Sequence, residues 1–181
     1  VIFIFIFILN FIKPLYSSNK DKIINNLINT NNIAFNFKQT IDEKTEKGNC
    51  IIEYPKKIFC KYKKSDDKIL VSNGKSLVIK TKNGSYYRYA IKSTPLNYIL
   101  DKNFLINEIK TLEERVIDDK FINFTILKDK NEINVFFDIK NFNLIGWQTL
   151  DIYQNLSITL LSSIIKNQEI DENLFKLPTQ D

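Results

Sequence analysis

The chain has 181 residues, 26% of them charged, and a formal net charge of +5. This length suits a single domain with a sizeable buried core. The absence of histidine excludes His-based catalytic triads and most zinc sites, and two cysteines alone cannot complete a structural zinc site. Hydrolysis by paired carboxylates stays open, although no Asp or Glu pair is marked out by its spacing. Neither an enzyme nor a bound cofactor or metal is therefore expected.

The positive charge is weak evidence about partners. Lysines are spread singly along the chain, arginines are few, and Asn, Ile and Lys are abundant everywhere. No basic run and no base-stacking motif stands out, so nucleic acid is not an expected partner.

The first segment, Val1 to Ile12, is almost entirely apolar and is followed by Lys13-Pro14 and the small residues Ser17 and Ser18. It is too short for a membrane span of about 20 residues and is typical of the apolar part of a secretory signal peptide. We therefore expect residues 1–18 to be a signal peptide cleaved near Ser17 or Ser18, with its start incomplete. Residues 19–181 would then form one exported domain.

A helix is predicted over Lys20 to Asn31, because Ile23, Ile24, Leu27 and Ile28 form one apolar stripe and Asn19 can cap it. The next segment, Ile33 to Thr40, alternates as a strand, with Ile33, Phe35, Phe37 and Gln39 on one face.

Both cysteines lie in the stretch Gly48 to Tyr62, which reads as two short strands folded about a turn at Pro55. A three-residue loop would place Cys50 directly opposite Cys60, at a typical Cβ separation of about 4.5–5.5 Å. A two-residue loop would place them on opposite faces of the ribbon. The sequence allows a disulfide here without requiring one.

Adjacent strands dominate the rest of the chain. Asn73-Gly74 and Asn83-Gly84 are the strongest hairpin turns, because Asn-Gly accepts positive φ at both central positions. Ser93 to Leu100 breaks the rhythm as a short helix, and Asp101 to Glu114 is ambiguous. Strands are expected at 49–54, 57–64, 67–72, 75–82, 85–91, 116–128, 132–140, 143–153 and 156–165, with one helical turn at 170–175. This pattern predicts an antiparallel meander, closed or partly closed.

The apolar inward faces permit two interpretations. They either pack a solid β core or line a cavity, since a large barrel with only short helices does not fill itself. Periodicity does not distinguish these two. The residues concerned are Phe35, Phe37, Ile52, Ile58, Val71, Val135, Phe137, Ile145 and Trp147.

From Ile23 to Pro178 the chain resembles the periplasmic outer-membrane lipoprotein carrier (LolA-like) family. The resemblance lies in the order and spacing of several blocks: FKQT at 37–40, IFCKY at 58–62, KILVSNGKSLVIK at 68–80, STPLNYIL at 93–100, LIGWQTLDIYQNLSITLL at 144–161 and IDENLFKLP at 170–178. It implies a mainly β fold with short helices, an incomplete antiparallel barrel whose apolar cavity is covered by a helical lid.

The resemblance also implies a function and a site. Such proteins take acylated lipoproteins from an inner-membrane ABC-type lipoprotein-releasing complex and pass them to an outer-membrane receptor. A monomeric periplasmic carrier is therefore expected, and the alternative is a sensor that binds lipidated or misfolded partners without transporting them. Leu96, Ile99 and Leu100 of the lid, with Tyr54 and the inward residues above, would contact the acyl chains.

Two departures from the family pattern bear on this site. The family commonly has an arginine just before Pro55 that is thought to hold the lid, whereas this chain has Tyr54. Cys50 and Cys60 stand where bulky apolar residues are usual. In an exported protein, two cysteines at these positions favour a disulfide.

Overall fold

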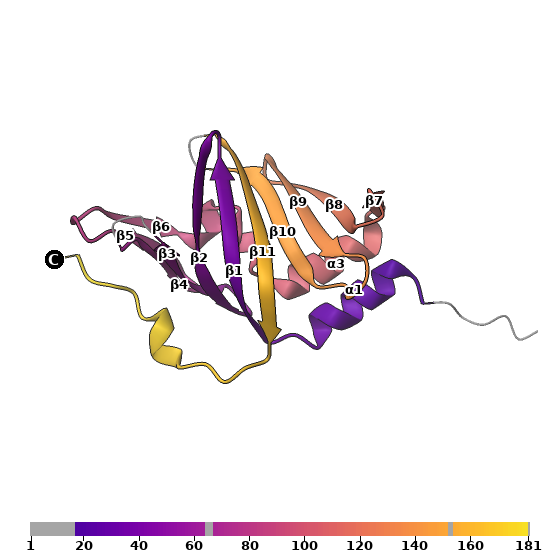
Figure 1. The fold of residues 1–181 in the computed structure, drawn as a ribbon, viewed down its shortest axis with the longest axis horizontal. Coiled ribbons are helices and arrows are strands. Elements are labelled where there is room, and N and C mark those ends of the chain that lie inside the picture. The colour runs from indigo at the N-terminus through magenta and orange to yellow at the C-terminus, as the bar shows by residue number, and fades with distance from the viewer. Residues whose placement is uncertain (1–16, 64–66, 152–153, 181) are drawn as a thin grey trace, which may run out of the picture.

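One curved antiparallel sheet carries the fold, as Figure 1 shows. The computed structural model describes residues 17–63, 67–151 and 154–180. The strands are β1 (Asn32–Ile41), β2 (Lys44–Glu53), β3 (Lys57–Lys63), β4 (Ile69–Asn73), β5 (Ser76–Lys80), β6 (Tyr86–Ala90), β7 (Arg115–Ile117), β8 (Phe121–Lys128), β9 (Asn131–Asp138), β10 (Leu144–Leu150) and β11 (Leu156–Lys166).

The sheet is not closed. Its order is β6-β5-β4-β3-β2-β1-β11-β10-β9-β8-β7, which leaves β6 and β7 at the two edges. Every pair of neighbours is consecutive in the chain except β1 and β11, which pair along most of their length, from Ile33 opposite Lys166 to Ile41 opposite Ser157. The expected fold class, a mainly β and unclosed antiparallel barrel with short helices, is confirmed.

Short helices cover one face of this sheet. They are α1 (Asn19–Ile28), the 3-10 turn η1 (Ile91–Ser93), α2 (Leu96–Ile99) and α3 (Lys102–Thr111). In Figure 1, α3 lies behind β9 and β10, so the outer face of the sheet is turned towards the viewer. None of the helices in the described ranges is long and apolar enough to cross a membrane.

The helix ends are set by local caps. Ser18, rather than the predicted Asn19, caps α1: its hydroxyl accepts a hydrogen bond from the Asp21 backbone and the Asp21 carboxylate accepts one from the Ser18 backbone. This reciprocal pair satisfies two backbone donors that a helix start leaves without partners. The ambiguous segment after Asp101 is the helix α3, with the Asp101 side chain accepting from the Phe104 backbone.

Two predictions about turns are corrected by the structure. The expected strand 116–128 is divided into β7 and β8, because Asp118 and Asp119 both have positive φ and aspartate tolerates this conformation in turns. At Asn73-Gly74 the positive φ belongs to the glycine, while the Asn73 side chain accepts hydrogen bonds from the Lys75 and Ser76 backbones.

The hairpin of β2 and β3 has the three-residue loop. Glu53 lies opposite Lys57 and Cys50 lies opposite Cys60, with their Cα atoms 4.1 Å apart and their sulfurs bonded. Pro55 lies in the turn, after a cis peptide bond.

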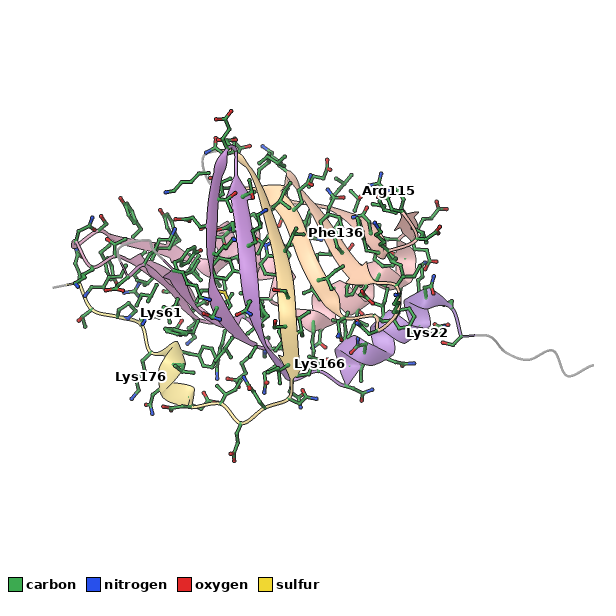
Figure 2. All side chains as sticks on the ribbon, in the orientation of Figure 1. Lys22, Lys61, Arg115, Phe136, Lys166 and Lys176 are labelled. Atoms are coloured by element: carbon green, nitrogen blue, oxygen red, sulfur yellow. A yellow bond between two sulfur atoms is a disulfide. The ribbon has the colours of Figure 1, made fainter. Side chains whose placement is uncertain are left out.

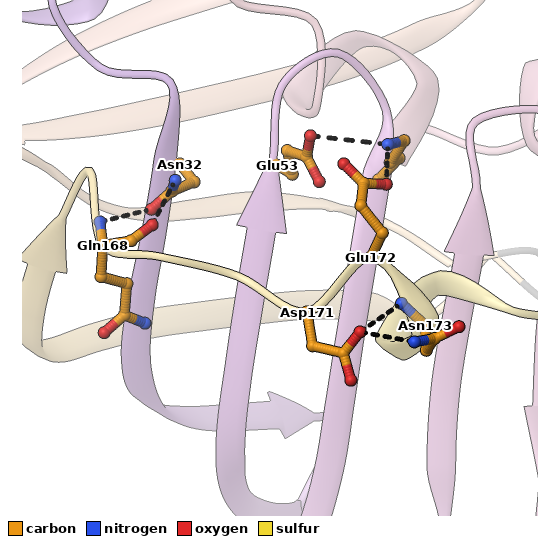
Figure 3. A network of polar contacts seen from close by, with 7 residues as sticks. Asn32, Glu53, Gln168, Asp171, Glu172 and Asn173 are labelled. Carbon is orange, nitrogen blue, oxygen red and sulfur yellow. Dashed lines mark hydrogen bonds and ion pairs between the residues drawn. The ribbon is translucent and has the colours of Figure 1, made fainter.

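The C-terminal segment crosses the outer face of the sheet. Its 3-10 turn η2 (Glu172–Phe175) packs on β3 and β4, and Figure 3 shows how polar contacts hold it to the strands. Asn32 exchanges two hydrogen bonds with the Gln168 backbone, and Lys57 bonds Glu172 at 2.8 Å. The bond to Lys57 lowers the pKa of Glu172, so this contact weakens as the pH falls through that pKa.

The structure leaves no room for a side chain at Gly48. A Cβ there would overlap the Lys61 carbonyl oxygen and lie 2.5 Å from the Phe37 ring. Gly84, with φ of +90°, has nothing within 4 Å of the same position. We expect Gly48→Ala to cost about 3 kcal/mol or more, because backbone must move, and Gly84→Ala to cost about 1 kcal/mol from backbone strain alone. Urea unfolding of both variants measures this, and equal costs would contradict the packing at Gly48.

The cross-strand disulfide is also open to test. Alkylation of the denatured, unreduced protein should find no free thiol, and Cys50→Ala with Cys60→Ala should lower the free energy of unfolding by about 2–3 kcal/mol for a loop of this size. Two alkylated cysteines in the purified native protein would contradict the bond.

Candidate functional site

A pocket of about 320 Å³ lies on the inner face of the sheet. Its walls come from β1 to β6 on one side and from β10 and β11 on the other. Most of these side chains are apolar, and the volume is at the low end of the roughly 300–1,000 Å³ usual for small-molecule sites. The lining includes Phe37, Ile41, Cys50, Ile58, Cys60, Tyr62, Leu70, Leu77, Ile79, Tyr87, Tyr89, Leu96, Trp147 and Leu150.

The segment Thr94 to Leu96 also lines the pocket. It lies between η1 and α2, in the part of the chain that leads from the edge strand β6 to the opposite edge strand β7. Leu96 is half-buried, whereas Ile99 and Leu100 have no exposed surface. This short helical segment is the lid of the pocket, and Leu96 is its apolar contact.

Few polar contacts hold the lid. The Lys56 backbone donates to the Leu100 carbonyl at 2.7 Å, and the Lys56 ammonium lies 3.3 Å from the Asp101 carboxylate. On its other side the Tyr98 hydroxyl donates to Asp129, which raises the pKa of Tyr98. The lid contact from the β2–β3 turn is therefore made by Lys56, and not by Tyr54.

Tyr54 has a different place. Its side chain packs on the core and lines a separate small hollow with Leu27, Phe142 and Leu144. Burial raises the pKa of its hydroxyl, so Tyr54 stays neutral beneath α1.

The pocket has one polar end. Gln39 donates to Ser157 and Thr159, both at 3.3 Å, and accepts from the Tyr62 hydroxyl at 3.3 Å. Lys68 forms an ion pair with Glu46, and its ammonium lies 3.8 Å from the centre of the Tyr62 ring. Burial, with a smaller effect from the Glu46 charge, raises the pKa of Tyr62. These groups satisfy one another, so the polar end is built before any ligand arrives.

The structure brings some predicted site residues to the pocket and leaves others in solid core. Phe37, Ile58, Leu96, Trp147 and both cysteines line it. Six predicted site residues belong instead to the continuous core and do not border the pocket. Each has no more than about 5% of its surface exposed; they are Phe35, Ile52, Ile99, Leu100, Val135 and Phe137.

Two predicted contacts lie on the wrong face. Val71 follows Leu70, which lines the pocket, so it points outward. There it is buried opposite Val78, on the strands that η2 covers. Ile145 lies at a register shift in β10, where Leu144 pairs with Phe137 and Gly146 with Phe136. This bulge adds one residue, so Leu144 and Trp147 are buried and Ile145 lines a groove on the outer face.

Sequence reasoning missed the walls from β4 to β6 and the lid contact of Lys56. The alternation of residues along β4, β5 and β6 could have predicted these walls, because it places Leu70, Leu77 and Ile79 on one face. Tyr87 and Tyr89 lie on that same face. No local pattern marks Lys56, since its role depends on where Leu100 and Asp101 lie in space. Within the described ranges, no group of three or more Cys, Asp or Glu side chains is arranged to hold a metal ion.

Three solved structures are similar to this chain. A LolA superfamily protein from Nitrosomonas europaea is 7% identical, with a TM-score of 0.46 over 89% of this chain and 99% of that one. MucB is 8% identical, with a TM-score of 0.51 over 91% of this chain and 65% of that one. A putative outer membrane lipoprotein-sorting protein domain from Vibrio parahaemolyticus is 9% identical, with a TM-score of 0.43 over 80% and 88%. No curated protein matches significantly.

A family model identifies the chain more directly than these structures do. The model of the outer membrane lipoprotein carrier protein LolA matches residues 28–178. This span contains every strand and the whole lid segment. The chain therefore belongs to the LolA family of outer membrane lipoprotein carrier proteins.

Proposed function

We propose that this protein is a periplasmic carrier that binds the acyl chains of lipoproteins in the lidded pocket and moves them from the inner to the outer membrane. The observation that carries the proposal is the apolar pocket whose wall includes the lid residue Leu96. Membership of the LolA family agrees with it.

The physical demand on such a carrier matches this site. Each acyl CH₂ kept from water is worth about 0.8 kcal/mol, so a lipoprotein with several long chains needs an apolar container in water. The container must also release its contents. A pocket closed by a four-residue helix and a few polar contacts opens at less cost than a packed core does.

The pocket as it stands is small for such cargo. About 320 Å³ accommodates one small ligand rather than several long acyl chains. Loading therefore requires the lid to move away from the sheet. Breaking the Lys56 contacts to Leu100 and Asp101 is the step that frees its C-terminal end.

The route follows from the same proposal. A signal peptide in residues 1–18 would send the domain to the periplasm, and this segment lies almost wholly outside the described residues. The inner-membrane ABC-type complex would supply loaded lipoproteins, and an outer-membrane receptor with a better apolar site would remove them. Transfer then needs no catalysis and no cofactor.

The first test is release of lipoproteins from spheroplasts. Purified protein should solubilise acylated lipoproteins in a one-to-one complex, and an outer-membrane fraction should then take them up. Binding without this onward transfer would support a sensor instead, and no binding would contradict both. Lipoproteins lacking the acylated cysteine serve as the control cargo.

Two lid variants test the site itself. Leu96→Asp should leave the β-fold intact but abolish loading, because a carboxylate at the pocket wall faces water when the lid is open and is buried against acyl chains when it is loaded. Ile99→Asp should unfold the domain, because Ile99 has no exposed surface.

Circular dichroism and the release assay on both variants decide between pocket and core. A folded and fully active Leu96→Asp protein would remove the lid from the binding site. A folded Ile99→Asp protein would contradict its burial.

A further inference from the structure

The outer face of the sheet carries a row of basic residues that the sequence does not reveal. Phe37 and Gln39 point into the pocket, so Lys38 between them points outward. The same alternation turns Lys47 outward beside Glu46 and Lys63 outward beside Tyr62. Lys38 lies opposite Lys47, and Lys47 opposite Lys63, so the three lysines stand side by side across β1, β2 and β3.

On the other half of the sheet, the residues level with this row are uncharged as far as β8. Lys38 lies opposite Leu160, Leu160 opposite Gly146, and Gly146 opposite Phe136. Figure 2 shows Phe136 on one side of β1 and β11, and Lys61, which neighbours the row on β3, on the other. Phe136 lies opposite Asn123, and Asn123 lies opposite Arg115 on the edge strand β7.

Sheet stability does not explain this row. Like charges directly opposite each other destabilise a sheet. Lys38, Lys47 and Lys61 are exposed and form no ion pair with any carboxylate of the described chain. Glu53, at the far end of β2, and Glu172 of η2 bring carboxylates to this face, and both bond Lys57 rather than Lys38, Lys47 or Lys61.

Aliphatic side chains border the lysines. Leu156, Ile158 and Leu160 alternate along the outer face of β11, next to β1, and Leu156 and Leu160 are 44% and 49% exposed. A face that combines unpaired cations with adjacent exposed aliphatic groups is the composition of interfacial membrane binding: the lysines attract anionic headgroups and the aliphatic groups enter the boundary layer.

We propose that this outer face, comprising Lys38, Lys47, Lys61, Leu156 and Leu160, docks the protein on a bilayer that contains anionic phospholipid. The pocket lies on the opposite face of the same strands, so docking leaves its lid free to move. Nucleic acid fits less well, because the side chain beside Lys38 on β11 is the half-exposed Leu160 rather than an aromatic ring for base stacking. The inference goes beyond lipoprotein transport and does not depend on which ligand the pocket holds.

Co-sedimentation with lipid vesicles tests the proposal. The protein should bind vesicles of phosphatidylcholine that contain about 30% phosphatidylglycerol, and not vesicles of phosphatidylcholine alone. Each lysine near an anionic surface contributes about a fivefold increase in partitioning. Lys38→Gln with Lys47→Gln and Lys61→Gln should therefore weaken binding on the order of 100-fold.

A matched variant separates the face from the net charge. Lys75→Gln with Lys110→Gln and Lys140→Gln removes the same charge at exposed sites off this face, and it should bind nearly as well as the unchanged protein. Both triple variants should keep their circular dichroism and their release activity in the carrier assay. Leu156→Ser with Leu160→Ser should remove the part of binding that survives high salt.

Three results would overturn the proposal. They are equal binding to both vesicle types, no binding to either, and equal losses in the two lysine triples. If the second result came with binding to a polyglutamate matrix, the face would be assigned to an acidic protein. If the unchanged protein bound anionic vesicles but released no lipoprotein from spheroplasts, the carrier function would be refuted and this inference would stand.

Discussion

The pairing of the first strand with the last is the constraint on which the rest of the structure depends. Because β1 and β11 join in the middle of the sheet, the two free edges fall at β6 and β7. These edges belong to strands that are consecutive in the chain, so the segment between them must pass from one edge of the sheet to the other. The chain order therefore obliges η1, α2 and α3 to cross the inner face (Figure 1).

That crossing divides the inner face into two parts. α3 is ten residues long, and its buried Leu105 and Ile109 belong to the continuous core with Phe124 and Phe137. α2 has only four residues, and Leu96 is the one among them that lines the pocket. The pocket lies where the covering helix, α2, is too short for its side chains to fill the concave inner face of the sheet.

Covalent and polar contacts act where the pocket wall would otherwise be free to spread. The Cys50–Cys60 bond joins β2 and β3 directly on the pocket side, and the turn between these strands supplies Lys56 to the end of the lid. The wall is thus held firmly while the lid is held by a few replaceable contacts. The proposed carrier function needs this division, because the pocket wall must keep its shape while the lid moves.

The sequence alone determined most of the strands, several turns and the family. Strand alternation is a local property with a period of two, and Pro55 and the Asn-Gly turns act on their own backbone, so these features were readable without the fold. The alternation also placed Phe37, Ile58 and Trp147 correctly on the inner face. It failed at Ile145, because a bulge changes the phase of a strand without any mark in the residues.

Tertiary structure decided the rest, for one physical reason: strand register and helix placement depend on partners far away in the chain. Filling by α3 made Val135 and Phe137 core rather than pocket wall, and the C-terminal turn η2 covered the strands that carry Val71. Lys56 became the lid contact in place of Tyr54 because Leu100 and Asp101 lie beside it in space. Lysines that are scattered in the sequence became one row, because the hairpins set Lys38, Lys47 and Lys63 opposite one another.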